Sequence, residues 1–266
     1  APSNSFWPHV EGLNRYVTRC QSVLQAGKPD HEVLVYWPVF DIWSDPEGLE
    51  MQLSVHNIRD WLNYPSVRRM SEQGHGFDFI SDRWLADSRV NNGEIITSRG
   101  ALPYRALIIP QCSYIPPGTL EKVLQMARDG AVVIMEQLPG DVPGLSGLAR
   151  RKDELDTMLA QLRFEENENG IMECRTGNGV ILLSGDFHRT LHSRGIRAEM
   201  INRFGLKYCR RTLEDGRYYY LVNHTADDLD TLLPLRTVAR SIVIMDPQNG
   251  KSGLACMDLS DEMPRV

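Results

Sequence analysis

Acidic side chains and one thiol follow the short apolar runs of this chain, where a parallel sheet would collect them at one edge. Asp41 and Asp82 come after the first two runs, Cys112 after the third and Glu136 after the fourth. A thiolate beside a helix start can act as a nucleophile, and Glu136 paired with Asp41 or Asp82 could act as acid and base in glycoside hydrolysis. No histidine stands at a recognised spacing from Cys112, so the sequence favours a buried thiol and helix-capping carboxylates.

The sequence contains no motif typical of a metal or nucleotide site. His188 and His192 are four residues apart on an expected helix, but no glutamate completes an H-E-x-x-H pattern. Gly-x-Gly occurs at 74–76 and 177–179, and neither instance follows a strand and opens a helix as a dinucleotide site requires. The five cysteines are scattered without a C-x-x-C, which favours free thiols. We therefore expect no cofactor and no metal.

Aromatic residues gather in the first third of the chain beside acidic ones. Trp37, Asp41, Trp43 and Asp45 lie close together in the sequence. Indole faces suit the apolar face of a sugar ring, and carboxylates accept hydrogen bonds from its hydroxyls. Aromatic side chains that pack helices onto a sheet give the same pattern. These four residues are the candidate substrate-binding set.

The elements that would position these residues alternate between strand and helix. Strands buried on both faces are predicted from apolar runs at 33–36, 76–80, 104–110 and 131–136. Helices are predicted from apolar residues at helical spacing at 13–24, 117–127 and 152–162. Pro65 is expected to restart a helix after Tyr64. This order predicts an α/β fold with an open doubly wound parallel sheet, like that of flavodoxin or the class I glutamine amidotransferases.

From residue 206 onward the pattern predicts strands alone. A hairpin is expected across 206–223, with further strands at 232–235 and 239–245. Four strands make a partial β-sandwich at best, since such folds usually need about seven. We therefore expect two domains, an α/β domain at 1–204 and a small, mainly β region at 205–266.

Composition excludes several classes of protein. The chain has 266 residues and a formal net charge of −6, with 42% hydrophobic and 24% charged residues. These fractions are typical of folded globular proteins, and no basic cluster offers a face for nucleic acid. No apolar run approaches the ~18 residues of a membrane span. Because residue 1 is Ala, we expect a processed chain or a piece of a longer one.

A resemblance to a known family runs along nearly the whole chain. The segments that carry it in the α/β half are 3–8, 13–27, 33–38, 76–82, 104–110 and 141–144. Those that carry it in the β region are Gly205-Leu206, Arg210-Arg211, 218–223 and 246–250. In this order they resemble the region that follows the catalytic barrel in α-L-rhamnosidases of glycoside hydrolase family 106. The α/β half is also similar to the amidotransferase-like domain of family 42 β-galactosidases.

The resemblance implies a supporting role instead of catalysis. A barrel needs about 250 residues of its own, so none of the family's catalytic residues can be carried over; Cys112 and Glu136 are the only candidates. We expect an accessory piece that buttresses the barrel, lines the sugar cleft or mediates assembly. The alternatives are a stand-alone α/β hydrolase or amidotransferase-like enzyme using Cys112, and a carbohydrate-binding module. The expected partners are the rest of the parent polypeptide, carbohydrate or a second copy, without nucleic acid or membrane. The resemblance implies a periplasmic or secreted location.

Overall fold

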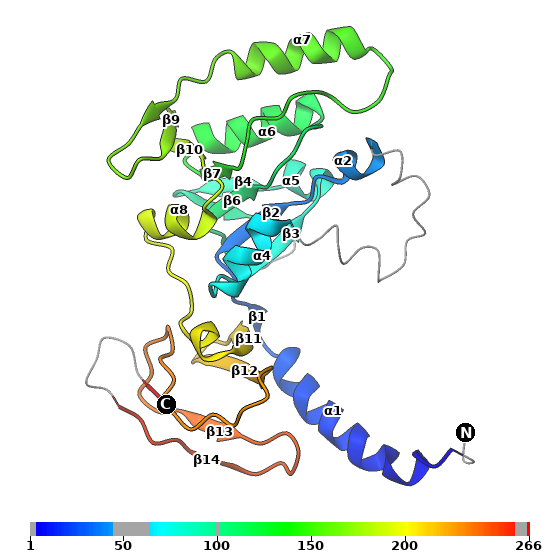
Figure 1. The fold of residues 1–266 in the computed structure, drawn as a ribbon, viewed down its shortest axis with the longest axis vertical. Coiled ribbons are helices and arrows are strands. Elements are labelled where there is room, and N and C mark those ends of the chain that lie inside the picture. Colours follow the sequence, from blue (N-terminus) through cyan, green and yellow to red (C-terminus); the bar gives the residue numbers. More distant parts are fainter. Residues whose placement is uncertain (1–3, 45–63, 99–101, 259–264) are drawn as a thin grey trace. The chain divides into compact units, whose positions relative to one another are not determined.

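The chain forms two compact units in the computed structural model, which describes residues 4–44, 64–98, 102–258 and 265–266 (Figure 1). Unit 2 is continuous, from His31 to Ala198, whereas unit 1 combines residues 1–30 with 199–266. This division differs from the expected one at residue 204, because the N-terminal helix packs on the C-terminal strands. Sequence periodicity indicates the helix but not its distant partner.

Unit 2 is built on a seven-stranded sheet whose strand order is β3-β2-β6-β7-β10-β9-β8. The first five strands in this order run parallel, β9 is antiparallel to β10, and β8 is antiparallel to β9. In chain order the strands are β2 (Val33–Tyr36), β3 (Phe77–Ile80), β6 (Ala106–Ile109), β7 (Val132–Met135), β8 (Glu165–Glu166), β9 (Met172–Thr176) and β10 (Gly179–Leu183). The predicted α/β fold with a doubly wound parallel sheet is confirmed.

Helices cover both faces of this sheet because its strands are apolar on both sides. Val33 and Val35 join one core cluster, and Leu34 and Tyr36 join the other, as alternation along a strand requires. α4 and α8 contribute to the first cluster, and α5, α6 and α7 to the second. The helices of unit 2 are α2 (Val39–Ser44), α4 (Pro65–Glu72), α5 (Asp82–Ala86), α6 (Pro117–Arg128), α7 (Leu148–Leu159) and α8 (Phe187–Ser193).

Two tight turns in unit 2 depend on residues with positive φ. β9 and β10 pair as a hairpin, and Gly177 turns it at φ 57°, where a Cβ would lie 2.3 Å from the Arg128 carbonyl oxygen. A second hairpin joins β4 (Arg89–Asn91) to β5 (Glu94–Ile96) through Asn92 at φ 51° and Gly93 at φ 80°. Asn-Gly is the strongest short hairpin signal, so this hairpin was predictable from the sequence.

Unit 1 pairs a long helix with a small sheet. Its elements are η1 (Trp7–His9), α1 (Val10–Leu24), β1 (Lys28–Pro29), η3 (Ile201–Phe204), β11 (Leu206–Thr212), β12 (Arg217–Asn223), β13 (Val243–Met245) and β14 (Ser252–Leu254). β11 and β12 form the expected hairpin, with β1 on the other side of β11. The strand expected at 232–235 is wrong, since only Pro234 bridges there, to Arg265. The strand expected at 239–245 is limited to its last three residues.

Among the helices that the structure describes, none combines the length and the hydrophobicity that crossing a membrane would require.

Candidate functional site

The candidate site lies at the carboxyl ends of the parallel strands of unit 2. Chain order β2, β3, β6 becomes spatial order β3-β2-β6, so the direction of winding reverses between β2 and β6. Open α/β sheets bind their ligands at such a switch point. Here the carboxylate of Asp41, in α2, accepts hydrogen bonds from the backbone N–H groups of Ser113 and Tyr114, both at 2.7 Å. The protein's own side chain therefore occupies the two amides that follow Cys112.

Asp82 joins three elements at the same edge of the sheet. Its Oδ1 accepts hydrogen bonds from the hydroxyl of Tyr36 at 2.9 Å and from that of Thr119 at 2.6 Å. Tyr36 is fully buried at the end of β2, and Thr119 belongs to α6. Burial, followed by the nearby charge of Asp82, raises the pKa of Tyr36 well above its ordinary value, so the phenol remains a donor.

Glu136 follows β7 and is bound in the same manner. Its Oε2 accepts hydrogen bonds from the Ser66 hydroxyl at 2.7 Å and from the Gln111 backbone N–H at 2.8 Å. Ser66 is buried in α4, which begins at Pro65 after Tyr64 as predicted. The arrangement ties α4 and the end of β6 to the end of β7. Together with Asp41 and Asp82, it shows that the strand-end carboxylates serve internal donors.

Cys112 is enclosed among these groups. Its side chain is fully buried, and its Sγ lies 3.4 Å from the Tyr114 carbonyl oxygen. Burial, with smaller contributions from Asp41 and Asp82, raises the pKa of the thiol well above its ordinary value. A nucleophilic cysteine needs an exposed position and a lowered pKa. The geometry therefore favours an inert thiol.

The aromatic candidates differ in their exposure. Trp37 is partly buried, and its backbone N–H donates to the Ile80 carbonyl at 3.0 Å. Trp43, at the end of α2, leaves 62% of its surface exposed and stacks edge-on against Phe40, with ring centroids 5.5 Å apart. Asp45 lies outside the described residues. Of the two tryptophans in the candidate set, Trp43 is the more exposed.

The histidines make a contact that the sequence did not indicate. His188 and His192 both lie on α8 as expected, and Nδ1 of His188 lies 3.0 Å from Nε2 of His75. His75 is buried, and its ring meets that of His188 edge-on. Arg197 bonds to His192. Among the described residues, no three potential ligands are grouped as a metal ion would need.

Unit 1 contains a buried ionic cluster that the sequence also did not indicate. Arg210 on β11 forms ion pairs with the carboxylates of Asp30, at 2.9 Å, and Glu199. Arg217 reaches Asp30 at 2.7 Å, and the Tyr219 hydroxyl donates to Glu199 at 2.8 Å. All three central side chains are less than 10% exposed. The cluster fixes the two points, residues 30 and 199, where the chain leaves unit 1 and returns to it.

The chain matches the model of a known protein family over nearly its whole length. The family model for alpha-L-rhamnosidases, glycoside hydrolase family 106, matches residues 4–256. The chain belongs to this family. A curated relative, named "Putative beta-glucuronidase" in Formosa agariphila, is 30% identical over 249 residues, which is 93% of this chain and 19% of the relative.

Solved structures show the same fold within larger proteins. The rhamnosidase from Novosphingobium sp. PP1Y superposes on 98% of this family 106 chain with a TM-score of 0.68 and 17% identity, over 23% of its own length. A GH42 beta-galactosidase, Gan42B from G. stearothermophilus, matches 96% of the chain with a TM-score of 0.52 and 12% identity, over 42% of its length. The chain thus spans about a fifth of its curated relative and of the rhamnosidase. The predicted relation to family 106 is confirmed, and the likeness to the family 42 β-galactosidase is one of fold.

Proposed function

We propose that this family 106 chain is a non-catalytic accessory part of a glycoside hydrolase and that it supports a catalytic region outside these 266 residues. The observation that carries the proposal is that the carboxylates at the strand ends are hydrogen-bonded within the protein. Asp41, Asp82 and Glu136 each accept two hydrogen bonds from the protein itself. A general acid or base must instead have its carboxyl group within reach of the substrate.

The anion-binding amides support the same proposal. In acyl-transfer enzymes, backbone N–H groups next to the nucleophile stabilise the developing oxyanion. The N–H groups of Ser113 and Tyr114, which follow Cys112, are taken by Asp41. Cys112 itself is a buried thiol. We propose that the amidotransferase-like α/β fold of this chain serves as a scaffold. The same role would account for its likeness to the fold of the β-galactosidase.

Activity assays with aryl rhamnosides test the proposal. The purified 266-residue chain should show no turnover above buffer. In the longer polypeptide, Glu136→Gln and Cys112→Ser should keep kcat/KM within about twofold of wild type when measured on protein that remains folded. Rapid turnover by the chain alone, lost in Glu136→Gln while the fold is retained, would refute an accessory role.

A second function is favoured by one observation, the exposed ring of Trp43 two residues after the partly buried Asp41. This ring offers the apolar surface on which a sugar can stack. We propose that this end of α2 lines a carbohydrate-binding surface. Titration of the intrinsic tryptophan fluorescence with rhamnose-containing oligosaccharides should saturate for wild type and not for Trp43→Ala. Trp7→Ala is the matched control, since it removes an exposed indole from unit 1.

A further inference from the structure

The apolar stripe of α1 is longer than the surface that covers it. At its C-terminal half, Cys20 is only 7% exposed and its Sγ lies 3.5 Å from the Tyr220 hydroxyl of β12. One and two turns earlier, Val17 is 39% and Leu13 is 46% exposed. Residues three and four apart share one side of a helix. The same stripe is therefore covered at one end of the helix and open at the other.

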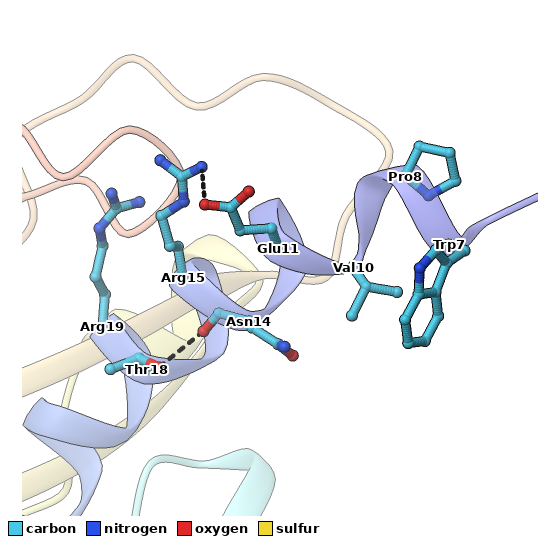
Figure 2. Close-up of a pocket in the computed structure, with 8 residues that line it drawn as sticks. All are labelled: Trp7, Pro8, Val10, Glu11, Asn14, Arg15, Thr18 and Arg19. Atoms are coloured by element: carbon cyan, nitrogen blue, oxygen red, sulfur yellow. Dashed lines mark hydrogen bonds and ion pairs between the residues drawn. The ribbon is translucent and has the colours of Figure 1, made fainter. Parts of the chain in front are cut away.

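Figure 2 shows how the open end continues toward the N-terminus. The indole of Trp7 and the side chain of Val10 point the same way from the helix start, while Glu11, Arg15 and Arg19 project to the opposite side. Trp7 is 50% exposed, and the open pocket of about 770 Å³ that it borders continues along the charged side of the helix, past Glu11 and Arg15. Phe6, next to Trp7, is 49% exposed. We call this surface the α1 face; it consists of Phe6, Trp7, Val10, Leu13 and Val17.

The helix cannot turn about its axis to hide the α1 face. On its charged side, Arg19 donates hydrogen bonds to the carbonyl oxygens of Pro247 and Gln248, at 3.0 and 2.9 Å. On its covered side, the Tyr16 hydroxyl meets that of Tyr220 at 3.3 Å. Contacts on these two sides fix the rotation of α1. The apolar residues are therefore held toward the outside of unit 1.

We infer that the α1 face docks against the part of the same polypeptide that lies outside these 266 residues. The inference rests on the proposed function, which places the catalytic region there. The relatives support it by their length, since the chain accounts for 19% of the curated relative and 23% of the rhamnosidase. An apolar surface that continues an existing helix contact is what such a junction requires.

The size and chemistry of the face favour this occupant over a separate chain. A stable complex between free proteins involves about 20–30 residues a side, and the α1 face offers five. Within one polypeptide a small surface suffices, because the effective concentration of a tethered partner is high. No charged side chain lies within the face, so we expect its partner surface to be apolar as well.

Hydrogen exchange measured on the 266-residue chain and on the longer polypeptide tests the inference. We expect amides 10–17 to exchange at least tenfold more slowly in the longer protein, while amides 20–24, already packed on β12, change little. Equal exchange of amides 10–17 in the two proteins would overturn the inference. Protection in the 266-residue chain alone, growing with protein concentration, would also overturn it, because a second copy would then be the occupant.

A pair of substitutions makes the test specific. Leu13→Asp in the longer polypeptide should raise exchange at residues 10–17 at least tenfold, whereas Leu145→Asp, at a leucine of unit 2 that is 88% exposed, should leave it unchanged. In the 266-residue chain, neither variant should shift the melting temperature, which checks that both fold. Failure of Leu13→Asp to act would refute docking even where the rhamnoside assays uphold the accessory function. Turnover by the 266-residue chain would instead refute that function and leave the exchange result as it stands.

Discussion

The two units differ in how many apolar side chains they bury. Nearly all of the buried apolar side chains belong to unit 2, whose two clusters cover both faces of the parallel sheet. Among the described residues of unit 1, the buried apolar side chains are Cys20, Ile201, Leu206 and Leu235. The exposed large apolar side chains show the opposite distribution, and unit 1 holds most of them, including Phe6, Trp7, Leu13, Val17, Val238, Val243, Ile244 and Leu254.

This contrast shows which unit can fold on the strength of its own core. Hydrophobic burial is the dominant favourable contribution to folding, and unit 2 has it on both sides of its sheet. Unit 1 has far fewer buried apolar side chains and also encloses the ionic cluster of Arg210, Asp30 and Glu199. A buried ion pair contributes little net stability but makes the loss of one partner costly. We therefore expect unit 1 to be the less stable of the two and the more sensitive to charge.

The largest expected effect follows from removing the central charge of unit 1. Arg210→Met leaves the carboxylate of Glu199 buried without its cation and that of Asp30 with Arg217 alone, which should cost about 3–5 kcal/mol. Hydrogen exchange should show that unit 1 loses protection while unit 2 keeps it. Arg217→Met is the control, because Arg217 is 38% exposed and such a pair is worth about 1 kcal/mol or less. Equal loss in both units would contradict the contrast.

A cavity in the core of unit 2 should give the next largest effect. Leu107 is fully buried in β6, and Leu107→Ala should lower the free energy of unfolding of unit 2 by about 3 kcal/mol through lost burial and the space left behind. Urea denaturation of the chain measures this value. Leu148→Ala provides the comparison, since this leucine of α7 is 38% exposed. A similar cost at both positions would show that the sheet core does not dominate.

Removing the carboxylate of Asp41 at the switch point should have a smaller effect. Asp41→Ala leaves the N–H groups of Ser113 and Tyr114 without their acceptor, which should cost unit 2 about 1–3 kcal/mol. Asp41→Asn keeps one acceptor oxygen and should cost less. Thermal unfolding of the two variants gives the order. If neither substitution lowers the melting temperature, the hydrogen bonds of Asp41 to these N–H groups do not stabilise unit 2.

The smallest expected effect is a pH dependence confined to unit 1. Burial alone would raise the pKa of Asp30, but Arg210, Thr212 and Arg217 together lower it below its ordinary value of 3.8. Stability from this carboxylate is therefore fully present above about pH 4 and is lost as the pH falls through the lowered pKa. Exchange measured between pH 5 and 3 should show this loss in unit 1, and Asp30→Asn should remove it. An unchanged acid dependence in Asp30→Asn would assign it to another group.

The sequence predicts those features whose cause is local. Continuous apolar runs indicate β2, β6 and β7, because strands covered on both faces need apolar residues at every position. Pro65 marks the start of α4 because proline suits the first turn of a helix. Position at the strand ends also places Asp41, Asp82 and Glu136 at the correct edge of the sheet.

The features that the sequence does not reveal join distant residues. Nothing local connects Asp41 to Ser113, or Arg210 to Asp30, which is 180 residues away. The carboxylates could be located from the sequence, but their donors, such as Ser66 and Thr119, could not. Whether an acid is free to react depends on these donors. The sequence therefore locates the candidate site but does not show whether its carboxylates are free to react.

The path of the chain through unit 1 has a consequence during synthesis. The hydroxyls of Tyr16 and Tyr220 meet although 204 residues separate them, and the whole of unit 2 lies between. At about 5–20 residues per second, the ribosome needs roughly 10–40 s to make that stretch. α1 is therefore made well before β11 and β12, and the part of its apolar stripe around Cys20 stays uncovered until these strands follow. We expect chaperones that bind nascent chains to meet α1 during that interval, while unit 2 completes its own fold.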